Sequence, residues 1–189
     1  MTVEIQYTIG DEVKDVNDVR GGLNIFVNGR RVVQYQEEDP SQWRHSWEPK
    51  FAGEYLHTVF SGLVKRAISL SKGDVKIYQE NVVKFGPTVS RLILEPLSDS
   101  DLRLAHRVTG GSVQEPPLPV SESARGYVVD RCEFSQAVSD AAHDYLADVR
   151  AFPLEWGEDL LEEFETALDE LDKSLVDCAN NTPSLQSRH

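Results

Sequence analysis

Two pairs of acidic and histidine residues have a spacing that could bind a metal ion. Glu54 precedes His57 by three residues and Asp140 precedes His143 by three, both in segments with helical periodicity. A carboxylate and a histidine at this spacing project from one helix face, as in the di-iron sites of ferritin-like bundles. Those sites need carboxylates from two further helices, whereas much of this chain has the pattern of strand or loop. We therefore interpret both pairs as solvated groups on helix surfaces and predict no metal ion or other cofactor.

The sequence contains no recognisable motif for a nucleophile or a phosphate-binding loop. Gly21-Gly22 and Gly110-Gly111 lack the spacing of GxGxxG and GxxxxGK[ST], so we interpret each pair as a turn. GxSxG and HExxH sequences are also absent. Among 32 acidic residues, a carboxylate pair for acid–base catalysis cannot be chosen from sequence. We therefore name no catalytic residue, and the chain is more simply interpreted as a protein that is not an enzyme.

A short segment rich in tryptophan is a candidate binding loop. Trp43, Arg44, His45 and Trp47 lie close together between Pro40 and Pro49. Tryptophan and arginine are enriched at interface hot spots, and loops often carry binding residues. The alternative is that both indoles fold back on the core, and it carries more weight because most large aromatic side chains are buried.

An acidic helix is expected at about residues 158–175, with leucine and phenylalanine along one face. Its other face carries Glu162, Glu163, Asp169 and Glu170, offset by few basic residues. Like charges four residues apart cost a helix some stability, so this face could serve a basic partner. The alternative is a merely solvated face, which is the commoner case in an acidic protein.

A net charge of −13 narrows the classes of partner. It argues against direct binding to nucleic acid and against anionic membrane surfaces, because both need clustered lysine and arginine. The acidity either keeps the protein soluble or faces a basic protein partner. The N-terminus has no signal-peptide pattern and no apolar run could span a bilayer, so a cytoplasmic location is expected. In that compartment Cys132 and Cys178 are expected as two reduced, unpaired thiols.

The pattern of elements predicts an α+β fold in a single domain, residues 1–176, followed by a disordered tail at 177–189. Asn28-Gly29 between two β-rich runs predicts a hairpin within 23–35. We expect a mostly antiparallel sheet of about six to eight strands with three helices. The other expected strands are 3–9, 74–80, 82–86, 88–95, 101–109 and 125–131, and the expected helices are 54–71, 133–150 and 158–175.

Residues 15–29, DVNDVRGGLNIFVNG, resemble the opening of small uncharacterised bacterial proteins, some of them similar to immunity proteins of toxin systems. The order of elements after this segment is also similar. The resemblance implies a protein that acts by binding another protein, and it supplies no catalytic residue.

Three functions remain open from the sequence. The first is an acidic protein-binding module, of the immunity type, that occludes a basic partner such as a nucleic-acid-cleaving toxin. The second is an enzyme or small-ligand protein with an unrecognised pocket that uses His45, His57, His106 or His143. The third is a structural subunit of a larger assembly.

Overall fold

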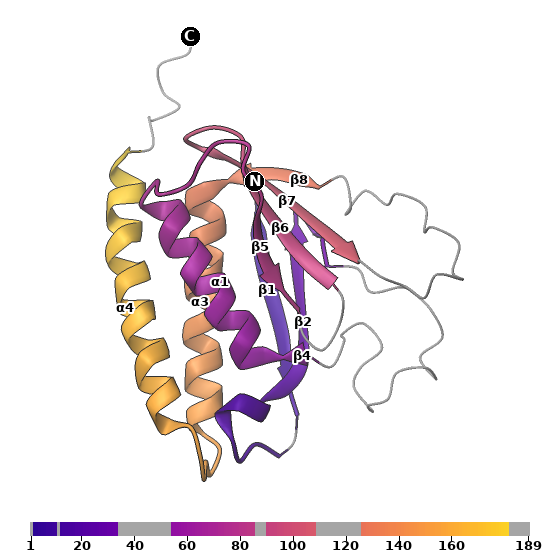
Figure 1. Cartoon of the computed structure of the whole chain (residues 1–189), viewed down its shortest axis with the longest axis vertical. Helices are drawn as coiled ribbons and strands as arrows, with labels where there is room; N and C mark the ends of the chain where they lie inside the picture. The colour runs from indigo at the N-terminus through magenta and orange to yellow at the C-terminus, as the bar shows by residue number, and fades with distance from the viewer. Residues whose placement is uncertain (1, 11, 34–53, 86–89, 109–125, 182–189) are drawn as a thin grey trace, which may run out of the picture.

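The chain folds into two antiparallel sheets and a layer of helices, shown in the computed structural model (Figure 1). The structure describes residues 2–10, 12–33, 54–85, 90–108 and 126–181. Within these ranges the elements are β1 (Val3–Ile9), the 3₁₀ helix η1 (Val16–Asp18), β2 (Arg20–Val27), β3 (Arg30–Arg31), β4 (Glu54–Tyr55), α1 (Leu56–Ser71), β5 (Asn81–Lys84), β6 (Ser90–Pro96), β7 (Asp101–Val108), β8 (Tyr127–Asp130), α3 (Arg131–Arg150) and α4 (Glu158–Asn181).

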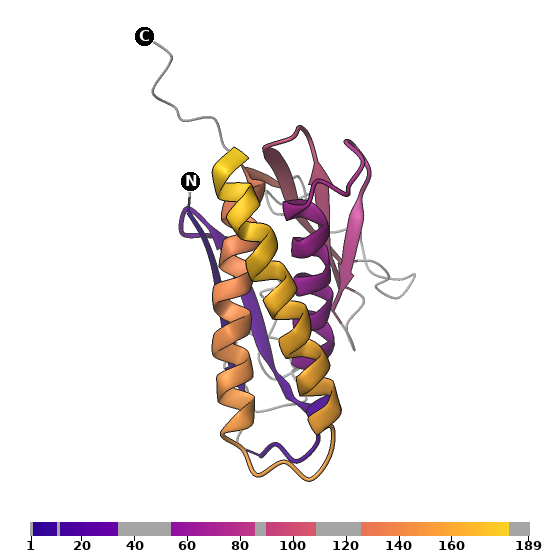
Figure 2. The same ribbon diagram turned by 90° about the vertical axis from the view of Figure 1, so that its left-hand side faces the viewer.

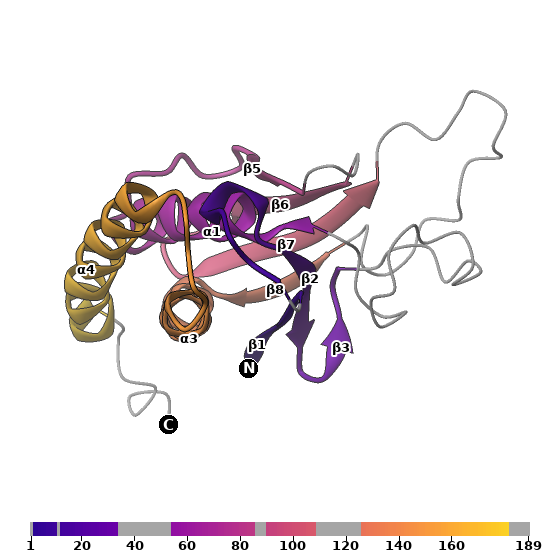
Figure 3. The ribbon, with the colours of Figure 1, turned by 90° about the horizontal axis from the view of Figure 1, so that it is seen from below.

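The strands are divided between two sheets of four strands each in the described part of the chain. In the first sheet β2 pairs with β1, β3 and β4, and the second has the order β5-β6-β7-β8. Every one of these pairings is antiparallel, so the predicted α+β class is confirmed. Figure 2 shows α4 in front of α3 and α1 with the sheets behind, and Figure 3 shows α4 on the side remote from the strands. Among the helices described, none is long and apolar enough to cross a membrane.

The hairpin between β2 and β3 is confirmed, with Asn28 at φ 51° and Gly29 at φ 74°. Positive φ at both turn residues is what a type I′ turn requires. The interpretation of Gly21-Gly22 as a turn is wrong, because both residues lie in β2 opposite β1. A Cβ atom on Gly21 would stand 1.8 Å from the carbonyl oxygen of Thr8. Glycine is therefore needed there for the close approach of two strands.

The start of α1 and the segment after it differ from the prediction, whereas the predicted end of the helix at Ser71 is confirmed. Glu54 and Tyr55 pair with β2 as the short strand β4, so the helix begins at Leu56. The predicted strand 74–80 is wrong: this segment forms turns, and Tyr78 has a φ of 61°. Its apolar residues alternate over too short a run to distinguish a strand from a turn-rich connection.

Helix α4 continues to Asn181, well past the predicted end near 175 and the predicted start of the tail at 177. Cys178 lies in this extension and forms a disulfide with Cys132 of α3, with a Cα–Cα distance of 5.9 Å. The expectation of two free thiols is therefore wrong. The helices run antiparallel about the connection 151–157, and the cysteines lie at matching distances on either side of it. Packing of α4 against α3 brings their sulfurs together.

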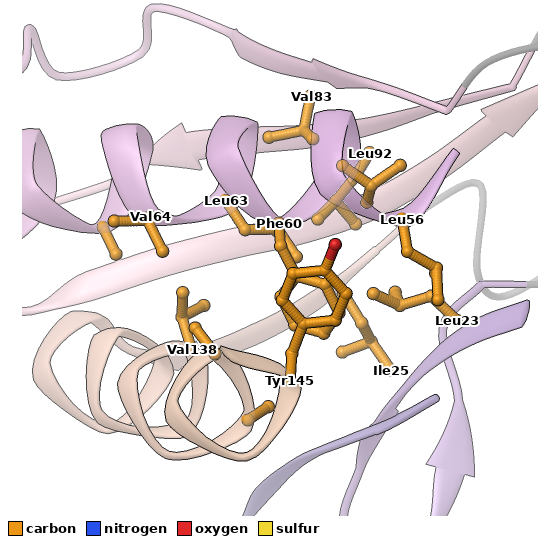
Figure 4. Close-up of a cluster of buried hydrophobic side chains, with 14 of the residues drawn as sticks. Leu23, Ile25, Leu56, Phe60, Leu63, Val64, Val83, Leu92, Val138 and Tyr145 are labelled. Atoms are coloured by element: carbon orange, nitrogen blue, oxygen red, sulfur yellow. The ribbon is translucent and has the colours of Figure 1, made fainter. Parts of the chain in front are cut away.

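One hydrophobic core joins the helices to both sheets. Phe60 of α1 and Tyr145 of α3 stack with ring centroids 4.4 Å apart, and both are fully buried. Figure 4 shows Ile25 from the first sheet and Leu92 from the second sheet beside this pair of rings. The two sheets therefore pack into the same core and hold the helices above them.

Candidate protein-binding surface

A buried stripe fixes which side of α4 faces solvent. Leu161, Phe164, Leu168 and Leu171 recur every three or four residues and are 0–3% exposed. They pack α4 into the core, which it contacts through α1 and α3. The opposite side of the helix is therefore the outermost surface of the helical layer (Figure 2).

That outer side carries a set of carboxylates that we call the α4 acidic face. Its members are exposed, and within the described residues they have no ion-pair partner. They comprise three of the residues selected from sequence, Glu162, Glu163 and Asp169, together with Glu158 and Asp159 at the start of the helix. Glu158 and Asp159 also interact favourably with the helix dipole, so part of their charge is accounted for structurally.

Ion pairs on both flanks of this face tie α4 to its neighbours. Glu170, the fourth α4 residue selected from sequence, pairs with Lys72 at the end of α1 and so differs from the others. Arg150 of α3 donates two hydrogen bonds to Glu165, at 2.9 and 2.7 Å, and these bonds lower the pKa of that carboxyl. Exposed pairs of this kind contribute little stability each, so the buried stripe sets the rotation of α4 and the pairs agree with it. The α4 acidic face is thus held in one orientation.

A serine, an aspartate and a histidine meet between α3 and α4, but in the wrong order for a catalytic triad. The Ser139 hydroxyl donates to Asp172 Oδ1 at 2.6 Å, and His143 Nε2 lies 2.9 Å from Asp172 Oδ2. A triad needs the histidine between serine and carboxylate, so that the imidazole takes the hydroxyl proton. Ser139 is also buried. The group therefore joins two helices and cannot generate a nucleophile at this serine by the triad mechanism.

The histidines of the ligand-binding hypothesis are scattered where the structure describes them. His57 lies among the rings of Tyr145 and Phe164, His106 is 3% exposed in β7, and His143 is on the surface of α3. Glu54 is fully buried, so its interpretation as a solvated helix residue is wrong. Within the described ranges no three His, Cys, Asp or Glu side chains could together hold a metal ion. Those residues therefore do not combine into one reactive site.

His57 makes stability depend on pH. Burial lowers the pKa of His57, and its Nδ1 atom has no hydrogen-bond partner among the described residues. The unfolded chain, with a histidine pKa near ~6.5, therefore binds a proton before the folded protein does. We expect stability to be complete above that pH and to fall as the pH drops toward the lower folded value. The loss should be at most about 1 kcal/mol, because the ring is only partly buried.

Urea unfolding between neutral and mildly acidic pH measures this effect. The control is His57→Phe, which keeps an aromatic ring in the cluster and cannot titrate. As the pH falls, the wild type should lose more free energy of unfolding than the His57→Phe variant. Parallel curves for both proteins would show that His57 is not the titrating group.

The loop selected from sequence, with Trp43, Arg44, His45 and Trp47, lies outside the described residues. The structure instead presents a tryptophan that the sequence analysis did not select, Trp156, which is 68% exposed. Its signal in the sequence is its place in the short connection between two amphipathic helices.

Three basic residues of the second sheet share one face, although one of them, Arg107, is paired with Glu80 at 2.9 Å. Lys84, Arg91 and Arg107 are direct cross-strand neighbours in β5, β6 and β7 and therefore share one sheet face. Val83 and Leu92, next to them in sequence, point into the core, so the three cations point away from the helices. Among the described residues this sheet face is therefore less acidic than α4, and the difference would help to orient the α4 acidic face toward a basic surface.

Comparison of this chain with protein-family models, curated proteins and solved structures found no match.

Proposed function

We propose that this protein is an acidic protein-binding module whose α4 acidic face binds a basic protein. The observation that carries the proposal is a helix face with five exposed carboxylates that form no ion pair among the described residues, flanked by carboxylates that are paired. Repulsion between residues four apart, such as Glu158 and Glu162, costs the isolated helix some stability. Contact with a basic surface would remove that cost and would speed association.

The partner we favour is an enzyme with a basic cleft, such as a nucleic-acid-cleaving toxin, which this protein would occlude as an immunity-type inhibitor. The resemblance of residues 15–29 to bacterial proteins of that type supports this choice. These residues mainly build η1, β2 and the hairpin turn. They therefore support the kind of protein and not the position of its binding surface.

The other two functions have less support. An enzyme or small-ligand protein would need converging polar groups, and the described histidines lie on separate elements. A structural subunit would use the same surface in a permanent complex. Its complex would withstand high salt, since permanent interfaces are more hydrophobic than transient ones.

The cytoplasmic location expected from sequence stays a prediction. The Cys132–Cys178 disulfide counts against it, because the cytosol keeps most thiols reduced. Alkylation of free thiols in freshly lysed cells tests the location: reduced sulfurs would support it and a fully oxidised pair would contradict it.

Reversal of charge on the α4 acidic face should weaken binding to the basic partner at physiological salt, chiefly by slowing association. The test variant is Glu162→Lys with Asp169→Lys, both exposed and without an ion-pair partner in the described part of the chain. We expect the association rate to fall by at least about tenfold, because steering by charge supplies rates well above the neutral range. The partner is captured by affinity purification at low salt, purified, and measured by surface plasmon resonance across a salt series.

The matched control is Glu4→Lys with Asp99→Lys, which makes the same change in net charge at exposed positions on β1 and on the turn between β6 and β7, outside α4. Circular dichroism checks that both variants keep their helices. If the α4 variant and the control variant weaken binding equally, the effect comes from net charge alone and the proposal is overturned. Binding that neither salt nor the α4 variant changes would overturn the proposal.

A further inference from the structure

Trp156 is the one tryptophan within the described residues, and 68% of its surface is accessible. It lies in the connection between α3 and α4, at the lower end of the molecule in Figure 1 and beside the start of the α4 acidic face. Its neighbours in this connection, Phe152 and Leu154, pack partly against the core, whereas the indole does not. Tryptophan is enriched at interface hot spots, so this exposed indole is a candidate anchor for a partner.

The backbone that carries Trp156 is held rigidly. Its N–H donates to the carbonyl of Lys14 at 3.1 Å, and its own carbonyl accepts from the N–H of Val16 at 3.2 Å. Gly157 follows with a φ of 88°, and a Cβ there would lie 2.8 Å from the Cβ of Val16. The connection is therefore packed tightly against the segment before η1. A side chain presented from a fixed backbone loses less entropy when it binds.

The charge around this indole is predominantly acidic. Glu155, which precedes Trp156, is paired with Lys14 at 3.2 Å. Glu158 and Asp159 follow the indole in the first turn of α4, where both are exposed and have no ion-pair partner among the described residues. Asp15 lies opposite Trp156 in an isolated bridge between the two segments. A flat aromatic ring among carboxylates is suited to a cationic side chain, which is attracted to the ring face and to the negative charge together.

The protein already uses this chemistry internally. The guanidinium carbon of Arg20 lies 4.1 Å from the ring centroid of Tyr55, and Arg20 Nε donates to Asp18 at 2.7 Å. An arginine is thus held between an aromatic face and a carboxylate within the same chain. Trp156 offers the ring and the carboxylates but, among the described residues, has no cation over it.

We propose that Trp156, with Glu158 and Asp159, receives an arginine or lysine side chain of the basic partner. This inference rests on the proposed function, and it identifies the anchor of the interface and the side chain that fills it. The α4 acidic face then supplies long-range attraction, while the indole supplies a short-range contact that holds one residue of the partner.

A peptide of alternating arginine and glycine serves as the probe. Trp43→Phe with Trp47→Phe leaves Trp156 as the sole tryptophan, so its fluorescence and its indole N–H resonance report contact directly. We expect the arginine peptide to shift both signals and a glutamate–glycine peptide of equal length to shift neither. Trp156→Ala, in the wild-type background, should weaken binding of the arginine peptide by roughly two- to fivefold, as measured by calorimetry.

The matched control is Tyr78→Asn, which removes an equally exposed aromatic ring, 72% accessible, from a distant loop at a position where asparagine tolerates positive φ. It should leave the affinity unchanged. Equal affinities for wild type and Trp156→Ala, or equal losses in both variants, would overturn the anchor while leaving the α4 acidic face in place. If Trp156→Ala loses affinity and the double variant Glu162→Lys with Asp169→Lys does not, the anchor is supported and the proposed function of the α4 acidic face is overturned.

Discussion

Removal of the Cys132–Cys178 disulfide should lower the free energy of unfolding by about 4 kcal/mol. The bond closes a loop spanning a sequence separation of 46 residues, and opening it restores conformational freedom mainly to the unfolded chain. It also joins the first turn of α3 to the last turns of α4, so the end of α4 should fray first. The effect is a large fraction of the stability of an ordinary domain.

Urea unfolding with and without a thiol reductant measures this loss. The variant Cys132→Ala with Cys178→Ala provides the control, because reductant should not change its unfolding curve. Hydrogen exchange should show the largest loss of protection in the C-terminal turns of α4. Coincident unfolding curves for oxidised and reduced wild type would contradict the prediction.

Replacement of Tyr145 by alanine should cost about 3–5 kcal/mol, the range for loss of a large aromatic side chain from a core. The ring is fully buried where α1, α3 and α4 meet. It stacks on Phe60 (Figure 4). It also makes T-shaped contacts with the rings of Tyr7 and Phe164, with centroids 6.1 and 5.8 Å away. No single neighbour can fill the cavity that alanine would leave, because each is held in the same cluster.

The hydroxyl of Tyr145, unlike its ring, should lower the free energy of unfolding. Burial raises the pKa of Tyr145, so the hydroxyl stays protonated, and it has no hydrogen-bond partner among the described residues. Tyr145→Phe removes this buried polar atom and keeps the ring. We expect it to be as stable as the wild type or more stable by about 1 kcal/mol. A loss above that size in chemical denaturation would show that the hydroxyl is hydrogen-bonded in solution.

Tyr7 offers the matched comparison for that substitution. Its hydroxyl donates to Asp148 Oδ2 at 2.6 Å and joins β1 to α3. Tyr7→Phe therefore removes a hydrogen bond to a charged group. Because Asp148 is exposed and water can take the place of the hydroxyl, the cost should be about 0.5–1.5 kcal/mol. If Tyr7→Phe lowers the free energy of unfolding and Tyr145→Phe does not, measured in the same assay, the cost at Tyr7 comes from the lost hydrogen bond and not from removal of a hydroxyl as such.

The local elements were largely predictable because they depend on neighbours in sequence. Asn28-Gly29 predicts the I′ hairpin since both residues tolerate positive φ. The leucines and phenylalanine of 158–175 predict both the helix and its outer side, and so place Glu162, Glu163 and Asp169 on the surface. Three of the four α4 residues selected from sequence are therefore members of the α4 acidic face.

The remaining features depend on contacts between distant segments. Gly21 looks like part of a turn, and only the approach of Thr8 shows that a strand there requires glycine. Glu170 has the same periodicity as its acidic neighbours, but Lys72 lies 98 residues away in the chain. No local pattern contains such a pairing.

The sequence by itself determined the α+β class, the amphipathic helices and the excess of negative charge, because composition and periodicity act within a few residues. Only the tertiary structure decided that Cys132 meets Cys178, that Tyr145 is buried without a hydrogen-bond partner in the described part, and that Trp156 is held outward. These outcomes follow from how α3, α4 and the two sheets pack together. Packing depends on the shapes of surfaces that are assembled from residues far apart in the chain.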